Sequence, residues 1–286
     1  MEFVKYHALG NDYLVLDSGN NDLPVISLTA EQVRKICNRN FGLGADGILV
    51  GSKDDSGKYF NLKIFNSDGS TAEKSGNGLR IFARFLWDKK LVNQSPFQIK
   101  TSGGLVTAVV DSPGTNVSVE MGTVSFQSAK IPVAGKSREV LNETIDIDGQ
   151  QLSFCASTIG NPHCVVLNGV QTETEVRRLG PLIETHPNFP NRINVQFLEV
   201  LNRGTIRIKI WERGAGYTLA SGSSSCAAAS VVHKLGLCDN QIEVHMPGGH
   251  LDITVSEDYS ITMRGAVTRV GEMSIESECF DFEMPV

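Results

Sequence analysis

Two short serine-glycine segments, about 146 positions apart, each stand directly before an apolar run. They read Ser75-Gly76-Asn77-Gly78 and Ser221-Gly222-Ser223-Ser224. Serine is a favoured N-cap residue, so a helix is expected to begin after each one. The first N–H groups of a helix have no partner inside it and bind anions such as carboxylates. Two plain helix caps would give the same pattern, but the matched pair and its glycines favour two carboxylate-binding loops.

The likeness between the halves extends beyond these loops. A strand-like run precedes each serine at the same distance, at 62–66 and 208–212, and Leu9-Gly10-Asn11 is echoed by Ile159-Gly160-Asn161. A repeat of half the chain length is too long for a solenoid. We therefore predict two similar domains, each offering one polar loop to a shared cleft. Such a cleft suits a reaction that needs equivalent groups on opposite faces of one atom.

The patterning predicts an α+β fold in which two pseudo-symmetric domains each wrap a mixed or antiparallel sheet around a central helix. Strands are expected at 15–16, 47–50, 97–100, 105–110, 116–121, 164–167, 206–210 and 251–255. Helices are expected at 29–38, 79–91, 173–179 and 226–235. We place the first domain at 1–121 plus 271–286 and the second at 122–270. The last strands, near 275–282, would return to the first domain.

Composition excludes several classes of protein. A net charge of −6 gives no electrostatic reason to expect nucleic acid or an anionic membrane as a partner. The chain has no apolar run of membrane-spanning length, and its first residues lack the pattern of a signal peptide, so a cytoplasmic location is expected. Six scattered cysteines without a Cys-x-x-Cys pair favour buried free thiols over a disulfide framework or a zinc site.

The run 42–47 matches the pattern G-x-G-x-x-G. A dinucleotide-binding loop would follow a strand and open a helix. Here the order is reversed, because a helix is expected before the run and a strand after it. A glycine-rich turn that serves the cleft is the better interpretation.

Several polar residues are expected at strand ends. They are Asn11, Asn66, Asn161, Asn194 and the pair Glu212-Arg213. An adjacent acid and base could bind the ammonium and carboxylate of a zwitterion. Asparagine in turns also serves the backbone alone, and an exposed ion pair contributes little, so each signal taken singly is weak.

Taken together, these segments resemble the diaminopimelate epimerases, enzymes that invert one stereocentre of an amino acid without a cofactor. The resemblance spans the chain through the segments 7–12, 44–47, 65–70, 160–164, 189–195 and 211–216. It implies two similar domains around a cleft, a homodimer, and a small amino-acid substrate. It also implies that neither metal nor any other cofactor is needed.

The resemblance breaks at the acid–base pair. Two cysteines of the family act on opposite faces of the α-carbon, and Ser75 and Ser221 occupy their positions here. A hydroxyl is a much weaker acid than a thiol, so it is a poor unaided base. Tyr217 stands where the family has glutamate, and Ser224-Ser225 replaces a smaller pair.

The resemblance implies roles for the remaining site residues. Asn66, Asn161, Asn194, Glu212 and Arg213, with Asn11, match positions that hold the substrate. Gly76, Asn77, Gly222 and Ser223 match those whose backbone holds the reacting carboxylate, and His163 and Glu212 match polar neighbours of the catalytic pair. Tyr217, which departs from the family, is expected to be a further supporting residue. Three explanations of the serines remain open: an engineered inactive form; natural activation by His163 or Glu212, for epimerisation or for racemisation or dehydration of another amino acid; and a non-catalytic binding protein.

Overall fold

The structure, a computed structural model, describes residues 1–17, 28–167, 169 and 172–281. It separates into two compact units, one formed by 1–119 with 265–286 and the other by 120–264. The chain crosses from one unit to the other within strand β8 (Asn116–Thr123) and returns within β17 (Ser260–Ala266). The domain boundaries expected from the sequence, at 121 and 270, remain a prediction about independent domains.

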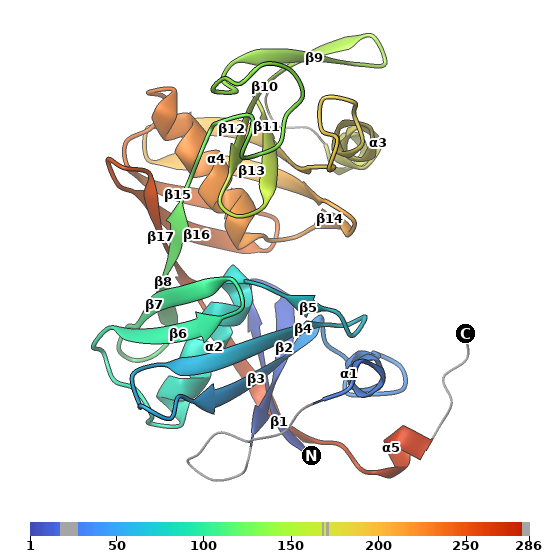
Figure 1. The fold of residues 1–286 in the computed structure, drawn as a ribbon, viewed down its shortest axis with the longest axis vertical. Coiled ribbons are helices and arrows are strands. Elements are labelled where there is room, and N and C mark those ends of the chain that lie inside the picture. Colours follow the sequence, from blue (N-terminus) through green and yellow to red (C-terminus); the bar gives the residue numbers. More distant parts are fainter. Residues whose placement is uncertain (18–27, 168, 170–171, 282–286) are drawn as a thin grey trace. The chain divides into compact units, whose positions relative to one another are not determined.

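The described part of the first unit is one sheet with the helices α1 and α2 and, near the end of the chain, the short helix α5 (Glu278–Asp281) (Figure 1). In chain order its elements are β1 (Glu2–Ala8), β2 (Asn11–Asp17), α1 (Ala30–Cys37), β3 (Gly47–Lys53), β4 (Phe60–Asn66), β5 (Thr71–Ala72), α2 (Gly76–Asp88), β6 (Phe97–Thr101), β7 (Gly104–Val110) and the start of β8. Strands pair in the order β18-β1-β2-β3-β4-β6-β7-β8, with β5 beside β4. The strand β18 (Thr268–Ser274) reaches this sheet from the end of the chain.

The second unit repeats this plan. Its elements are β9 (Glu143–Ile147), β10 (Gln150–Thr158), β11 (Pro162–Val166), α3 (Glu173–Glu184), β12 (Asn194–Asn202), β13 (Thr205–Glu212), β14 (Gly216–Thr218), α4 (Gly222–Lys234), β15 (Gln241–Met246), β16 (Gly249–Val255) and β17. Strands pair in the order β9-β10-β11-β12-β13-β15-β16-β17, with β14 beside β13.

The two units agree pair by pair in strand direction. The β2–β3 and β4–β6 pairs are parallel, as are β11–β12 and β13–β15, and the other matching pairs are antiparallel. The registers make Tyr13 equivalent to His163 and Asn66 equivalent to Glu212. The predicted α+β fold, built twice, is therefore confirmed.

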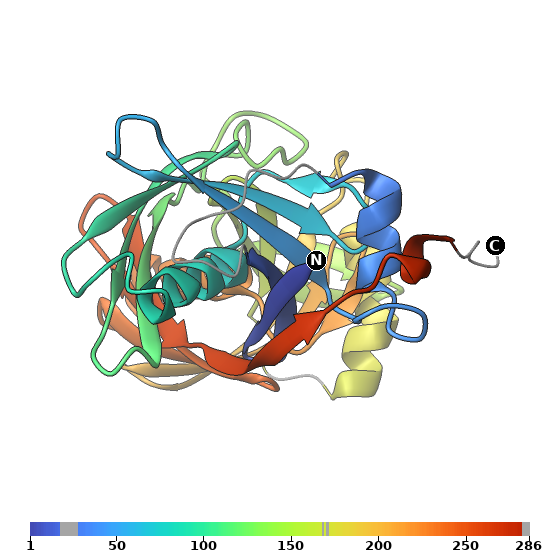
Figure 2. The ribbon, with the colours of Figure 1, turned by 90° about the horizontal axis from the view of Figure 1, so that it is seen from below.

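Each sheet curves around one central helix, α2 in the first unit and α4 in the second (Figures 1 and 2). Nine of the thirteen residues of α2 are buried, and so are ten of the thirteen residues of α4. Most of these buried residues are apolar or small, as expected for a helix that is covered on nearly all sides. Packing on nearly all sides therefore holds the first residues of each central helix at a fixed position in its unit.

The central helices fill their sheets in different ways. Phe82 of α2 lies against Gly51 of β3, where a β-carbon on the glycine would stand 2.3 Å from the phenyl ring. Leu198 and Ala228 occupy the equivalent positions in the second unit, and both are buried. The bulky side chain thus comes from the helix in one unit and from the strand in the other.

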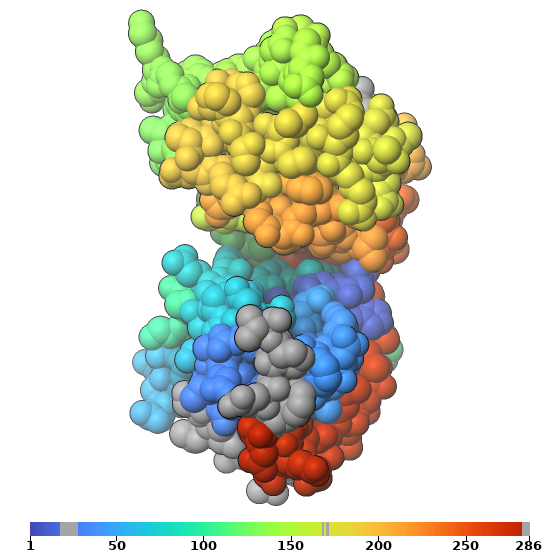
Figure 3. Space-filling model, turned by 90° about the vertical axis from the view of Figure 1, so that its right-hand side faces the viewer, coloured from blue at the N-terminus to red at the C-terminus, as the bar shows by residue number. Residues whose placement is uncertain are grey.

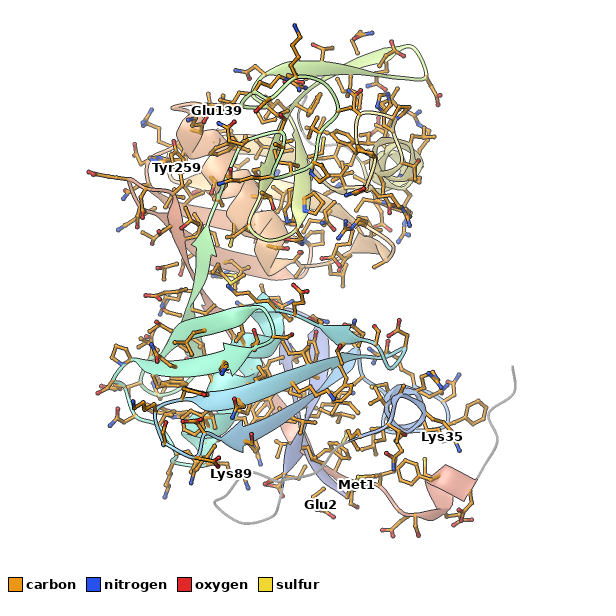
Figure 4. The ribbon with its side chains drawn as sticks, in the orientation of Figure 1. Met1, Glu2, Lys35, Lys89, Glu139 and Tyr259 are labelled. Atoms are coloured by element: carbon orange, nitrogen blue, oxygen red, sulfur yellow. The ribbon has the colours of Figure 1, made fainter. Side chains whose placement is uncertain are left out.

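A lysine fixes the C-terminal end of each central helix. Lys89 pairs with Asp17 at 2.6 Å, and Lys234 pairs with Glu139 at 3.2 Å while its ammonium lies 5.4 Å from the ring of Tyr259 (labelled in Figure 4). Cations are favourable at this end because the helix dipole is negative there. The opposite, N-terminal ends of the two helices, at Ser75 and Ser221, are therefore the ends available to bind a ligand.

Helix α3 is longer than expected from the sequence. We predicted an end at Leu179, before Gly180 and Pro181, but the helix continues to Glu184. Gly180 is needed inside it because a β-carbon there would lie 2.4 Å from the indole of Trp211. Packing against that indole, rather than helix propensity, explains the glycine.

The end of the chain also differs from the prediction. The strand expected near 275–282 lies earlier, as β18, and Glu278–Asp281 forms the short helix α5, while 282 is outside the described residues. Lys35 of α1 donates to the carbonyl of Phe280 at 2.7 Å. Figure 3 shows this segment (red) on the surface of the first unit. In the part of the chain that the structure describes, no helix is long and apolar enough to cross a membrane.

Candidate active site

Ser75 is the N-cap of α2, as predicted. Its backbone is extended, and its Oγ accepts a hydrogen bond from the Gly78 N–H at 3.0 Å. The N–H groups of Gly76 and Asn77 belong to the first turn of the helix, where no intrahelical acceptor is available. An anion near Ser75 would therefore be stabilised by backbone dipoles.

A second hydroxyl lies beside Ser75. The phenol oxygen of Tyr13, on β2, is 3.4 Å from the Ser75 Oγ, and the tyrosine ring is buried. Gly47 makes room for this ring, because a β-carbon there would lie 2.6 Å from Tyr13 Cε1 and 2.2 Å from the Phe65 carbonyl oxygen. The glycine-rich run, which does follow a helix and open a strand, thus ends in a residue that lets Tyr13 reach the serine.

Asn11 and Asn77 are locked to each other. Asn77 Nδ2 donates to Asn11 Oδ1 at 3.0 Å, and Arg80 donates to Asn77 Oδ1 at 2.6 Å. Asn11 in turn donates to Asp46 at 2.7 Å. This chain of hydrogen bonds ties the loop before β2 to the first turn of α2, so both asparagines are oriented before any ligand binds.

Asn66 ends β4 and bonds within its own turn. Its Nδ2 donates to Ser70 Oγ at 2.9 Å, and its backbone N–H donates to the Ser70 carbonyl. The expected binding role of Asn66 stays a prediction, because these bonds are those of a turn residue.

In the second unit Ser221 caps α4 and contacts a carboxyl group. Its Oγ accepts from the Ser224 N–H at 3.5 Å, and the Ser221 side chain lies close enough to the Glu212 carboxyl to affect its pKa. Burial raises the pKa of Glu212, and the neighbouring Ser221 hydroxyl offsets only part of that effect. A carboxyl group with a raised pKa beside a capping serine is suited to exchange a proton with it.

His163 lies in a chain of hydrogen bonds that reaches Ser223 in the first turn of α4. Gln196 Nε2 donates to His163 Nδ1 at 3.1 Å, so the ring proton resides on Nε2, which bonds to Asn161 Oδ1 at 3.0 Å. Asn161 then donates to Ser223 Oγ at 3.2 Å. Burial lowers the pKa of His163 to about 3, so the ring is neutral near pH 7. Its hydrogen bonds to Asn161 and Gln196 place it behind Asn161, where it orients that side chain.

Asn194 and Glu184 fix the loop that carries Arg213. Asn194 is buried, donates to the Pro162 carbonyl at 2.8 Å and accepts from the Arg213 N–H at 3.0 Å. Glu184, only 3% exposed, accepts from the Trp211 indole at 2.7 Å and from the Gly214 N–H at 2.8 Å. The Arg213 side chain is exposed and donates to the Asn191 carbonyl. The loop is therefore clamped from both sides while the guanidinium still offers further donors.

Tyr217 packs toward α3. The guanidinium of Arg177 lies 4.6 Å from the centre of its ring, and the ring contacts the apolar core of the second unit. A cation above an aromatic face is attractive. Its supporting role at the reacting groups stays a prediction.

Each capping serine and the polar residues around it in the same unit form what we call a half-site. Sequence reasoning missed three residues of the two half-sites, namely Tyr13, Glu184 and Gln196. Tyr13 had a signal in the sequence, since it stands two residues after Asn11 and is the repeat counterpart of His163. Glu184 and Gln196 had none, because each acts through contacts made by the tertiary fold.

Comparison with known proteins identifies the family of the chain. The family model described as "Diaminopimelate epimerase" matches residues 3–127 and 155–270. The chain belongs to the diaminopimelate epimerase family. It is 54% identical to a Nostoc sp. protein named diaminopimelate epimerase 2, over 99% of this chain and 98% of that one. It is 36% identical to diaminopimelate epimerase 1 of the same organism, over 94% and 98%, and 38% identical to the Desulfitobacterium hafniense enzyme, over 94% and 96%.

Solved structures share the fold of this family member at low sequence identity. A hydroxyproline epimerase from Agrobacterium vitis superposes with a TM-score of 0.66 at 16% identity, covering 96% of this chain and 90% of that one. A Bacillus anthracis phenazine biosynthesis protein of the PhzF family gives 0.66 at 14% identity, covering 96% and 99%.

Proposed function

We propose that this chain is a cofactor-independent epimerase that inverts an α-carbon of diaminopimelate, from the LL to the meso form, by two-base proton transfer. The observation that carries the proposal is the equivalent placement of Ser75 and Ser221, each the N-cap of a buried central helix. Membership of the family supplies the substrate class.

The two half-sites would act on one carbon. The first-turn N–H groups of both helices would hold the α-carboxylate and stabilise the charge that develops when the α-proton leaves. The side chain of one serine half-site would accept that proton. The other half-site would deliver a proton to the opposite face, which inverts the centre.

Serine needs help in such a reaction, and Ser221 has it. Glu212 can accept the hydroxyl proton, so the alkoxide of Ser221 need not form alone. Natural activation is therefore the explanation of the serines that the geometry favours. His163 is a weaker candidate, because burial keeps it neutral and its bonds go to Asn161 and Gln196.

The distal amino-acid end of the substrate would lie on Asn66, Asn161, Asn194 and Arg213. Calorimetry tests this by comparing diaminopimelate with lysine, which lacks the second carboxylate. Tighter binding of diaminopimelate is expected; equal or better binding of lysine would point to a racemase or dehydratase for another amino acid. We also propose a cytoplasmic homodimer, which sedimentation and cell fractionation would test.

The deciding experiment is exchange of the α-proton with deuterated water, followed by NMR. The natural chain should exchange the α-proton of diaminopimelate, and the Ser75→Cys/Ser221→Cys double variant should do so faster by orders of magnitude, because a thiol at a helix N-terminus has a pKa nearer neutrality. No exchange by either protein would refute the epimerase proposal and leave an amino-acid-binding protein.

A further inference from the structure

The acid–base partners of the two serines come from different positions of the repeat. Ser221 lies beside Glu212, whose counterpart in the first unit is the neutral Asn66. The Ser75 Oγ lies 3.4 Å from the Tyr13 hydroxyl, and the counterpart of Tyr13 is His163, whose ring is hydrogen-bonded to Asn161 and Gln196. Each serine thus has one titratable side chain beside it, supplied by a different strand.

We infer that Tyr13 acts through Ser75 as its proton partner, a positioning residue that supplies and withdraws the proton of the Ser75 hydroxyl during turnover. The inference rests on the proposed epimerase function and assigns the chemistry of its first half-site.

The arrangement is built for this contact. Tyr13 is 6% exposed, so its phenol is held by packing, and Gly47 leaves the space that the ring occupies. The Ser75 Oγ already accepts the Gly78 N–H, which leaves its proton free to point to another acceptor. A distance of 3.4 Å is long for a hydroxyl pair, but hydrogen bonds of catalytic groups commonly shorten when substrate binds.

The proton balance is simple. When the carbanion is protonated from this face, the Ser75 O–H bond breaks and the C–H bond forms. The Tyr13 O–H bond then breaks and restores the serine hydroxyl, which leaves a phenolate. In the reverse direction the phenolate takes the serine proton as serine takes the α-proton. A phenol has a pKa near 10, so its anion is far easier to form near neutral pH than an alkoxide.

Several charged groups near Tyr13 have hydrogen bonds or ion pairs of their own. Asp12, next to it on β2, bonds to Lys5 and Arg39, and Asp46, just before β3, bonds to Asn11 and Arg39. On the other packed elements, Tyr6 of β1 bonds to Asp88, and Arg80 of α2 bonds to Asn77. Glu73 and Lys74 directly precede Ser75.

Tyr6 provides a matched control. It is paired with Tyr13 across β1 and β2, and it is also buried. Its hydroxyl is hydrogen-bonded at 2.8 Å to Asp88, at the end of α2 that lies opposite Ser75. Tyr13→Phe and Tyr6→Phe therefore each remove one buried phenol oxygen from one sheet. Only the first removes it from the serine.

The test measures α-proton exchange of diaminopimelate in deuterated water against pH. Tyr13→Phe should lower kcat by about 10²-fold or more with KM little changed, as expected for loss of a general acid–base group. It should also remove the limb of the pH profile that belongs to the phenol. Tyr6→Phe should leave kcat and the profile shape unchanged.

A fluorinated tyrosine at position 13 keeps the hydroxyl and lowers its pKa, so the limb should move to lower pH. This variant decides the matter if Tyr13→Phe does not fold. An unchanged profile in the fluorinated protein, or equal losses in both phenylalanine variants, would overturn the inference while leaving the epimerase function intact. Absence of exchange by the natural chain would overturn both.

Discussion

Glu184 should contribute more to the second unit than any exposed carboxylate. Its oxygens accept from the Trp211 indole and the Gly214 N–H, and Arg192 pairs with it from the surface. In Glu184→Gln, one oxygen becomes an NH₂ group that faces one of these donors. A charge-assisted hydrogen bond worth about 1.5–3 kcal/mol is lost, and a buried N–H is left unpaired at about 1–3 kcal/mol. We expect a loss of roughly 3 kcal/mol.

The assay can follow the second unit alone. The chain has two tryptophans, Trp87 in the first unit and Trp211 in the second, so a Trp87→Phe background reports Trp211 fluorescence only. Urea unfolding in this background should give the loss in free energy of unfolding. Because the clamp also holds the Arg213 loop, the Kd for diaminopimelate should rise by about tenfold, which corresponds to about 1.4 kcal/mol.

Glu199→Gln is the matched control. Glu199 lies on β12 in the same unit, and it pairs with Arg207 at a site where both side chains are about a third or more exposed. Surface pairs of this kind contribute about 0–1 kcal/mol. A loss below about 1 kcal/mol in Glu184→Gln, with unchanged Kd, would refute the clamp.

Three other perturbations test the half-sites. Gly47→Ala should cost about 1–3 kcal/mol of stability by overpacking against the Phe65 carbonyl and should lower kcat; equal Tm and kcat would refute the close approach. Glu212→Gln should lower the rate of α-proton exchange by about 10²-fold or more. It should also remove the acid limb of the pH–rate profile, which should lie above the ordinary glutamate pKa because the raised pKa keeps the carboxyl protonated to higher pH. An unchanged acid limb would contradict the Ser221–Glu212 pair. Asp12→Asn should lower the free energy of unfolding at pH 7 by roughly 2 kcal/mol, because burial raises the Asp12 pKa but bonds from basic neighbours hold it at about 2. In the natural chain this contribution is fully present above about pH 4 and is lost as the pH falls toward 2. Equal acid-unfolding curves for the two proteins would refute the prediction.

The fold was predictable where local signals agree with the tertiary structure. Ser75 and Ser221 are good caps before apolar runs, and both helices begin there. Around Gly180 and Pro181 the local signal says that a helix ends, but contact with Trp211 requires the glycine and the helix continues. Helix propensity depends on the local sequence, so it cannot take account of Trp211, which lies 31 positions away from Gly180 in the chain.

The same distinction applies to the half-sites. The polar residues could be named because some of them recur in the repeat and because together they match the segments shared with the diaminopimelate epimerases. Which hydroxyl meets which acid could not be named, because it depends on the rotation of each side chain in a packed interior. Tyr13 and His163 share a position, yet only Tyr13 is hydrogen-bonded to the capping serine in the described structure.

The two units place the large side chain on opposite partners: on the helix for Gly51 and Phe82, and on the strand for Leu198 and Ala228. This difference limits how the two halves can be recombined. A chimaera that carries the α2 sequence in place of α4 would bring a phenyl ring against a strand that already presents leucine. The reciprocal chimaera would set alanine against glycine and leave a void the size of a benzyl group. After duplication, each half has therefore become committed to its own helix, and segments can be exchanged between them only together with the strand that faces them.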